Sequence, residues 1–233
     1  MIKIIWLGQG GFLLEHGDFR LLIDPYISDC VNKKDGFARL HPFPIALSDL
    51  NPDLLLVTHD HMDHLDPEGV PLIREMYPIC RYAGPDRSFS HFLKMGIPEK
   101  QIIKVSIGNR YQIGPFIVMP ITALHSDPSS CGYCIEAEGK KIILTGDTKY
   151  DESLFTPTLQ NADLLLICIN GKLNNMNVNE ALSYVKKIHP SAALPMHIGL
   201  FIENTADPVP FILGCKALKV KSFQMSPGKE FLI

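Results

Sequence analysis

Short apolar runs recur along the chain, and most of them stop at a histidine, an aspartate or an asparagine. Continuous apolar runs of this length predict buried strands, which places the polar residue that follows at the strand tip. In open α/β architectures, ligands bind outside the carboxyl ends of the strands. The runs are residues 54–57, 116–124, 141–145, 164–169 and 192–196, followed by His59, His125, Asp147, Asn170 and His197.

The first 23 residues contain three further apolar segments, separated by Gly10-Gly11 and by Gly17-Asp18. Glycine-rich pairs between apolar segments are turn signals, so these segments predict an antiparallel opening sheet. The third segment ends in Asp24-Pro25. This aspartate either starts a turn or lies behind a ligand at the strand tip.

Helical patterns alternate with the later strands. Asn177 and Glu180 form a capping-box pattern before the apolar stripe of a helix over Val178–Ile188. Asp66 is expected to cap a helix over Pro67–Met76, with the proline in its first position. The remaining expected elements are helices over 88–95 and from 207, and strands over 79–83, 102–105 and 223–233. The alternation predicts an α/β fold.

Residues 28–48 carry no periodicity and read as a long loop. Loops of this length inside a compact domain are often lids or binding loops. His41 lies in this loop and either contacts a substrate or is an ordinary loop histidine.

The densest chemistry lies between Asp53 and Asp66, in the segment DLLLVTHDHMDHLD. His59 and His61 can point the same way, while Asp63 and His64 reach a second position a few ångströms along. Neutral imidazole and carboxylate are the ligands that zinc, manganese or iron prefer. Two metals about 3.5–4 Å apart can share a water molecule and lower its pKa. The segment therefore predicts a metal site rather than a merely polar turn.

Charge and composition narrow the function classes. The formal net charge is −3 and the isoelectric point is about 6.3, so no global field would recruit nucleic acid or an anionic membrane. The 233 residues show no linker or low-complexity stretch, and we expect one domain spanning 1–233. No apolar stretch approaches the roughly 20 residues needed to span a bilayer, and the N-terminal apolar run is too short for a signal peptide.

The six cysteines are scattered, as is typical of reduced, buried thiols in a cytoplasmic protein. Cys131 and Cys134 form a C-x-x-C pattern, but they enter a strand-like segment that turns through Gly139-Lys140. A redox pair usually opens a helix, so a structural role is favoured over a redox role.

The run THDHMDH, with the downstream histidines and aspartate at strand ends, resembles the metallo-β-lactamase superfamily. The resemblance implies an α/β fold, the four-layer αββα sandwich, with two divalent metal ions, manganese or zinc. His59, His61 and His125 would hold one metal; Asp63, His64 and His197 would hold the other. Asp147 would bridge them, and Asp63 and Asp147 would be catalytic. Diiron oxidoreductase members carry glutamate where this chain has His61, which favours hydrolysis.

Further segments look like the L-ascorbate-6-phosphate lactonase group, namely 169–171, 174–181, 195–197, 201–204 and 207–208, with the loop around 41–43. This resemblance implies a cytoplasmic enzyme, a homo-oligomer, that opens a phosphorylated sugar lactone by attack of a metal-bound hydroxide. The alternatives are a metal-dependent phosphodiesterase, an amide or ester hydrolase of the same fold, and a non-catalytic metal-binding sensor. Nucleic-acid and membrane partners are not expected.

Substrate contacts are less defined by the sequence. The candidates are the side-chain amides of four asparagines and the imidazole of His41. Each amide could equally serve a turn or a helix cap. Asp24, Asp60 and His41 are candidates for supporting the ligands from behind, and Lys33, Arg39 and Lys172 for binding a phosphate. The amides are Asn170, Asn174, Asn175 and Asn177.

Overall fold

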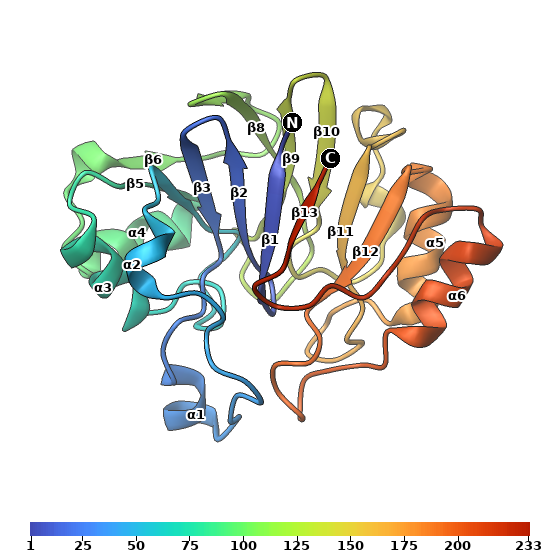
Figure 1. Cartoon of the computed structure of the whole chain (residues 1–233), viewed down its shortest axis with the longest axis horizontal. Helices are drawn as coiled ribbons and strands as arrows, with labels where there is room; N and C mark the ends of the chain where they lie inside the picture. Colours follow the sequence, from blue (N-terminus) through green and yellow to red (C-terminus); the bar gives the residue numbers. More distant parts are fainter.

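The computed structural model describes all 233 residues, and two facing β-sheets form its centre (Figure 1). The first sheet has the order β13 (Glu230–Leu232), β1 (Lys3–Gly8), β2 (Gly11–His16), β3 (Phe19–Ile23), β4 (Leu54–Leu56), β5 (Arg81–Gly84) and β6 (Ile102–Lys104). The second has the order β12 (Ala192–Met196), β11 (Leu164–Cys168), β10 (Lys140–Leu144), β9 (Cys131–Ala137), β8 (Phe116–Thr122) and β7 (Tyr111–Ile113).

Both sheets are mixed. In the first, β1, β2 and β3 pair antiparallel, as the sequence predicts, and β3 to β6 pair parallel. In the second, β8, β9 and β10 pair antiparallel, and β10, β11 and β12 pair parallel. The carboxyl ends of β1, β3 and β4 therefore lie on the same side of the first sheet, and those of β8, β10 and β12 lie on the same side of the second.

Helices cover the two outer faces, which gives the predicted four-layer arrangement. In Figure 1, α2 (Leu47–Leu50), α3 (Gly69–Met76) and α4 (Asp86–Lys94) lie outside the first sheet, and α5 (Val178–Ile188) and α6 (Val209–Ala217) lie outside the second. Asn177 and Glu180 form the predicted capping box at the start of α5. No helix combines the length and the apolar character that crossing a bilayer requires.

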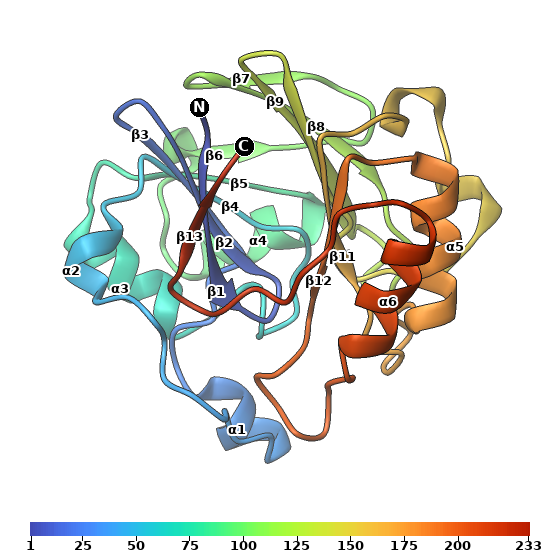
Figure 2. The same ribbon diagram turned by 45° about the vertical axis from the view of Figure 1, so that its right-hand side comes forward.

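The main core lies between the sheets, where 44 buried residues form one cluster that extends under α5 and α6. A second cluster packs the first sheet against α3 and α4. The two sheets are also joined by a polar contact, because the hydroxyl of Tyr133 in β9 donates to the carbonyl of Val57 at the end of β4, 2.7 Å away. Figure 2 shows the sheets facing each other.

The structure differs from the sequence expectations at a few boundaries. The 28–48 segment is not purely a loop, since it contains the short helix α1 (Cys30–Asp35) and the start of α2. Helix α3 begins at Gly69 rather than Pro67, and its N-cap is Glu68 rather than the predicted Asp66. Asp66 still holds the start of the helix, because its Oδ1 accepts from the backbone N–H groups of Glu68 and Gly69. The short 3₁₀ turns lie at Glu99–Gln101, Glu152–Leu154 and Pro157–Leu159.

Candidate metal centre

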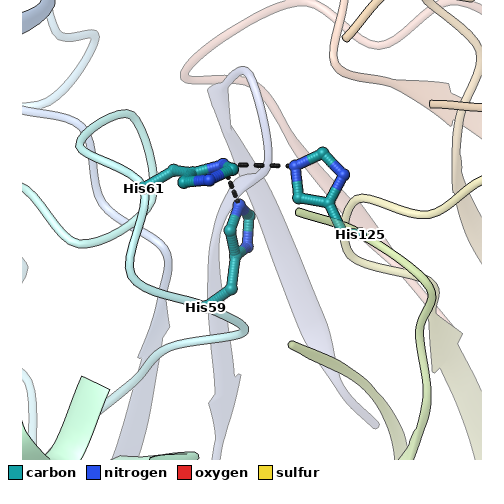
Figure 3. Close-up of side chains that lie close together, drawn as sticks. All are labelled: His59, His61 and His125. Carbon is teal, nitrogen blue, oxygen red and sulfur yellow. Dashed lines mark hydrogen bonds between the residues drawn. The ribbon is translucent and has the colours of Figure 1, made fainter. Parts of the chain in front are cut away.

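The turn after β4 carries the ligand-rich segment. The backbone N–H groups of His64 and Leu65 both donate to the carbonyl of His61, at 2.9 and 2.7 Å, which closes a tight turn. At the start of the turn, the backbone N–H of Thr58 donates to Asp24 Oδ1 at 2.8 Å. The turn is therefore held to the tip of β3, and the side chains of His59 and His61 point toward His125 (Figure 3).

Three histidines form the first cluster (Figure 3). Nδ1 of His61 lies 3.0 Å from Nε2 of His59 and 3.1 Å from Nε2 of His125. The other ring nitrogens of the first two are occupied: Nδ1 of His59 lies 2.9 Å from the hydroxyl of Thr58, and Nε2 of His61 lies 3.1 Å from the hydroxyl of Ser126. One nitrogen of each ring is thus directed at a common point.

Asp63, His64 and His197 form a second cluster, which we call the second metal position. Nε2 of His197 lies 3.4 Å from Nε2 of His64 and 3.5 Å from Oδ2 of Asp63. Nδ1 of His64 contacts Asp24 Oδ2 at 2.7 Å, so the second ring nitrogen of His64 faces this position. His197 adopts a left-handed backbone conformation, with φ of 61°.

Asp147 lies between the two clusters. Its Oδ2 is 3.0 Å from Nε2 of His197 and 3.9 Å from Nε2 of His125, and its Oδ1 is 3.4 Å from Nε2 of His64. Asn175 donates to the same Oδ2 at 2.7 Å, whereas the buried Oδ1 accepts no hydrogen bond. This is the position of a bridging carboxylate with free lone pairs.

The two clusters differ in charge. Burial, reinforced by neighbouring histidines, lowers the pKa of His59 and lowers that of His125 to about 4, so these rings are neutral. Burial opposes the charge of His197, but Asp147 and Asp63 raise its pKa to about 9. Burial likewise opposes the ionisation of Asp147, but His197 and His64 hold its pKa well below the usual range. A cation at the second metal position would replace protons in an existing ion-pair network.

The arrangement fits two divalent cations. Ligand atoms around a tetrahedral zinc, each bonded at about 2.0–2.1 Å, lie roughly 3.3 Å apart, and the ring nitrogens of the first cluster lie 3.0 and 3.1 Å apart. Three ring nitrogens at these separations suit a shared cation, and Asp147 Oδ1 is left buried and unpartnered. The donors are nitrogen and oxygen only, which suits manganese as well as zinc.

The glycines after β1 make room for the centre. A Cβ added to Gly10 would lie 2.6 Å from Cε1 and 3.0 Å from Nδ1 of His64. The Gly10-Gly11 pair therefore does more than form the predicted turn, because any side chain at Gly10 would displace a predicted ligand.

A cavity of about 220 Å³ opens beside His61 and Asp63. Helix α1 forms one wall, and the segment after β12 forms another. Five of its 11 lining residues are hydrophobic, and one cation, Lys34, is among the others. The lining residues are Val31, Lys34, Asp35, Phe37, Asp60, His61, Met62, Asp63, Leu173, Phe201 and Asn204.

All seven predicted ligands come together, but the predicted substrate amides are spread out. Asn175 contacts Asp147, and Asn170 donates to Asn204 at 2.7 Å inside the protein. Asn177 is used as the cap of α5, which is the alternative that the sequence left open, and Asn174 is exposed.

His41 packs beside Gly8 rather than in the cavity wall. The predicted phosphate-binding cations are engaged elsewhere. Arg39 donates to the carbonyls of residues 26–28, Lys172 to the carbonyl of Glu203, and Lys33 to the carboxylate of Glu68.

The structure also settles the surroundings of two aspartates. The carboxylate of Asp24 contacts His64. Asp60 instead lines the cavity, and its backbone N–H donates to Asp127 Oδ2 at 3.1 Å. Sequence reasoning missed Gln9, whose side chain lies inside the centre, and the two hydroxyls that orient His59 and His61. A single glutamine among glycines does not form a spaced pattern of metal ligands. The one feature that could have pointed to Gln9 is that β1 ends on the same side of the sheet as β4.

Comparisons with known proteins bear on the family and the fold. Residues 19–198 match the family described as Beta-lactamase superfamily domain. A UPF0173 metal-dependent hydrolase of Pyrobaculum islandicum is 29% identical over 247 residues, covering 100% of both chains. A UPF0173 protein of Pyrococcus furiosus is 32% identical over 213 residues, covering 90% of this chain and 89% of that protein. The solved structure of Igni18, a metallo hydrolase from Ignicoccus hospitalis, shares the fold, with a TM-score of 0.81 at 23% identity over 100% and 99% of the two chains.

Proposed function

Because the chain belongs to the metallo-β-lactamase superfamily, we propose that it is a metal-dependent hydrolase that opens a phosphorylated sugar lactone. The observation that carries the hydrolase proposal is the convergence of seven imidazoles and carboxylates on two adjacent positions beside an open cavity. The lactone proposal rests on the resemblance to the L-ascorbate-6-phosphate lactonase group and on the composition of that cavity.

The bound metals would supply Lewis acidity and bring the pKa of a water molecule close to neutral. Asp147 is held by Asn175 and keeps one oxygen free to orient that water. Asp63 belongs to the centre and also lines the cavity. It can accept a proton as the water oxygen bonds to the lactone carbonyl carbon, and return the proton to the ring oxygen as the C–O bond breaks.

Lys34 is the candidate for binding the phosphate group. It stands in the last turn of α1, lines the cavity, and forms no ion pair. Asp35 and Asp60 line the same cavity and would repel a phosphate. The aromatic rings of Phe37 and Phe201 offer apolar surface to the C–H face of a sugar ring.

Because Lys34 and Asp35 carry opposite charges, replacing them should change KM in opposite directions. With L-ascorbate-6-phosphate, Lys34→Ala should raise KM about tenfold, which corresponds to about 1.4 kcal/mol of lost attraction, while Asp35→Asn should lower KM. Lys33→Ala is the matched control, since its ammonium binds Glu68, and KM should stay unchanged. Equal KM values in all three variants would contradict the assignment of the phosphate group to this wall.

A second candidate is a carboxylic ester with an apolar group. It is favoured by the apolar part of the cavity wall, including Leu173, which is 63% exposed at the cavity. An aryl lactone without phosphate distinguishes the two: it should be the better substrate under this second proposal and the poorer one under the first. A phosphodiester in the same panel tests the remaining hydrolytic alternative.

A further inference from the structure

Gln9 has its side chain inside the proposed metal centre. It lies in the turn between β1 and β2, is fully buried, and has a φ of 50°. Its carbonyl accepts from the indole N–H of Trp6 and from the backbone N–H of His197, each at 3.0 Å. The backbone of Gln9 is therefore held on one side by the core and on the other by a predicted ligand.

The amide end of Gln9 takes a ligand's place at the second metal position. Its Nε2 lies 3.0 Å from Oδ2 of Asp63 and 3.2 Å from Nε2 of His197. These separations match those among the predicted ligands themselves, which are 3.4 Å between His64 and His197 and 3.5 Å between His197 and Asp63. The amide thus stands at a further corner of the same site.

The other atom of this amide has no partner. Oε1 of Gln9 is buried and accepts no hydrogen bond, which is costly for a carbonyl oxygen. A half-turn about the last side-chain torsion exchanges the amide oxygen and nitrogen with little change in occupied space. The Asp63 carboxylate attracts the N–H group, whereas a cation between Asp63 and His197 would attract the oxygen instead.

We propose that Gln9 is an additional ligand of the second metal, bound through its side-chain carbonyl oxygen. The proposal rests on the proposed metal centre and goes beyond its seven predicted ligands. An amide oxygen is a hard ligand, of the kind that manganese and magnesium accept more readily than zinc does. Gln9 would therefore bias the second position toward manganese.

A hydrogen bond from Gln9 to Asp63 is the competing role, and two substitutions separate them. Gln9→Glu keeps an oxygen ligand but replaces the N–H donor with a carboxylate that repels Asp63. Gln9→Leu removes both the ligand and the donor. Ligation predicts that glutamate preserves the second site, whereas the hydrogen-bond role predicts that glutamate damages it at least as much as leucine does.

The experiment measures metal binding rather than turnover. Calorimetric titration of chelator-stripped protein with manganese and, separately, with zinc gives the number and affinity of the sites. We expect Gln9→Leu to bind the second manganese about ten- to a hundredfold more weakly, with the first equivalent unchanged, and the loss for zinc to be smaller. Gln9→Glu should bind the second manganese at least as tightly as the wild type.

The first equivalent, at His59, His61 and His125, reports that each variant is folded. Wild-type affinity for the second manganese in Gln9→Leu would overturn the proposal, as would a weaker second site in Gln9→Glu than in Gln9→Leu. Failure of the wild-type protein to bind any metal would instead overturn the proposed metal centre.

Discussion

Oδ2 of Asp24 lies 2.7 Å from Nδ1 of His64, and both side chains are buried, with exposed fractions of 1% and 0%. The hydroxyl of Thr58 donates to the same Oδ2 at 2.5 Å and lies 2.9 Å from Nδ1 of His59. One carboxylate thus orients an imidazole at each of the two proposed metal positions, so that Nε2 of each ring is left for a cation.

Replacing Asp24 should weaken both metal positions. In Asp24→Asn, the amide nitrogen can face Nδ1 of His64 and favour the tautomer whose proton blocks Nε2. We expect affinity for metal to fall about ten- to a hundredfold, measured by titration of chelator-stripped protein. Thr58→Val is the control: it removes the hydroxyl that joins Asp24 to His59 but keeps the contact of Asp24 with His64, so the affinity of the second metal position should fall less than in Asp24→Asn. Unchanged affinity in Asp24→Asn would contradict the orienting role.

Gly10→Ala should damage the second metal position by a steric route. The added methyl group would lie 2.6 Å from a carbon of the His64 ring, which Asp24 holds in place. We expect less than two equivalents of bound metal by elemental analysis. Gly17→Ala is the matched control, since a Cβ added there would have no atom within 4 Å, although φ is 59°. This variant should lose about 1–2 kcal/mol of stability and retain both metals.

Asn175 and Asn177, two residues apart, should behave differently. Asn175→Ala removes the donor to Asp147, and we expect kcat to fall about tenfold or more, with the fold intact. Asn177→Ala removes the cap of α5 and should lower the free energy of unfolding by about 1 kcal/mol, with kcat unchanged. Urea denaturation and steady-state kinetics on both variants measure the two effects. A raised KM with unchanged kcat in Asn175→Ala would instead indicate a substrate contact.

All six cysteines are buried and unpaired, and they should be unreactive in the native protein. Burial raises the pKa of the Cys131 thiol to about 12 and that of Cys134 to about 11. At pH 8, a thiol with a pKa near 11 is ionised in about one molecule in a thousand. A thiol-exchange reagent at pH 8 should label the protein only after denaturant is added. Rapid labelling of this pair in the native state would support the redox role that the sequence disfavours.

The seven proposed ligands could be predicted because each follows an apolar run, and four of them share one short turn. The alternation of strands and helices predicts on which side of a sheet each strand ends. Residues far apart in sequence, such as His125 and His197, could therefore be placed on the same side. The cap of α5 was predictable for a different reason: the contacts of Asn177 and Glu180 are local in sequence.

Other features depend on contacts that leave no local pattern. Gln9 reaches the centre because β1 runs parallel to β3 and β4, and Asp24 joins the centre across 40 positions of sequence. Helix α1 has no apolar stripe of its own, since it buries only Cys30 and Val31. The role of Lys34 in the cavity wall likewise depends on how α1 packs, and its neighbours Lys33 and Arg39 are equally basic in sequence but engaged elsewhere.

The most direct test of the proposed function is the hydrolysis of L-ascorbate-6-phosphate by chelator-stripped protein after manganese is added, with zinc and no metal in parallel samples. We expect turnover to be negligible without metal, to be restored by manganese, and to be absent in a folded His64→Ala variant. Protein that binds two equivalents of manganese and still does not hydrolyse this lactone with either metal would contradict the assignment.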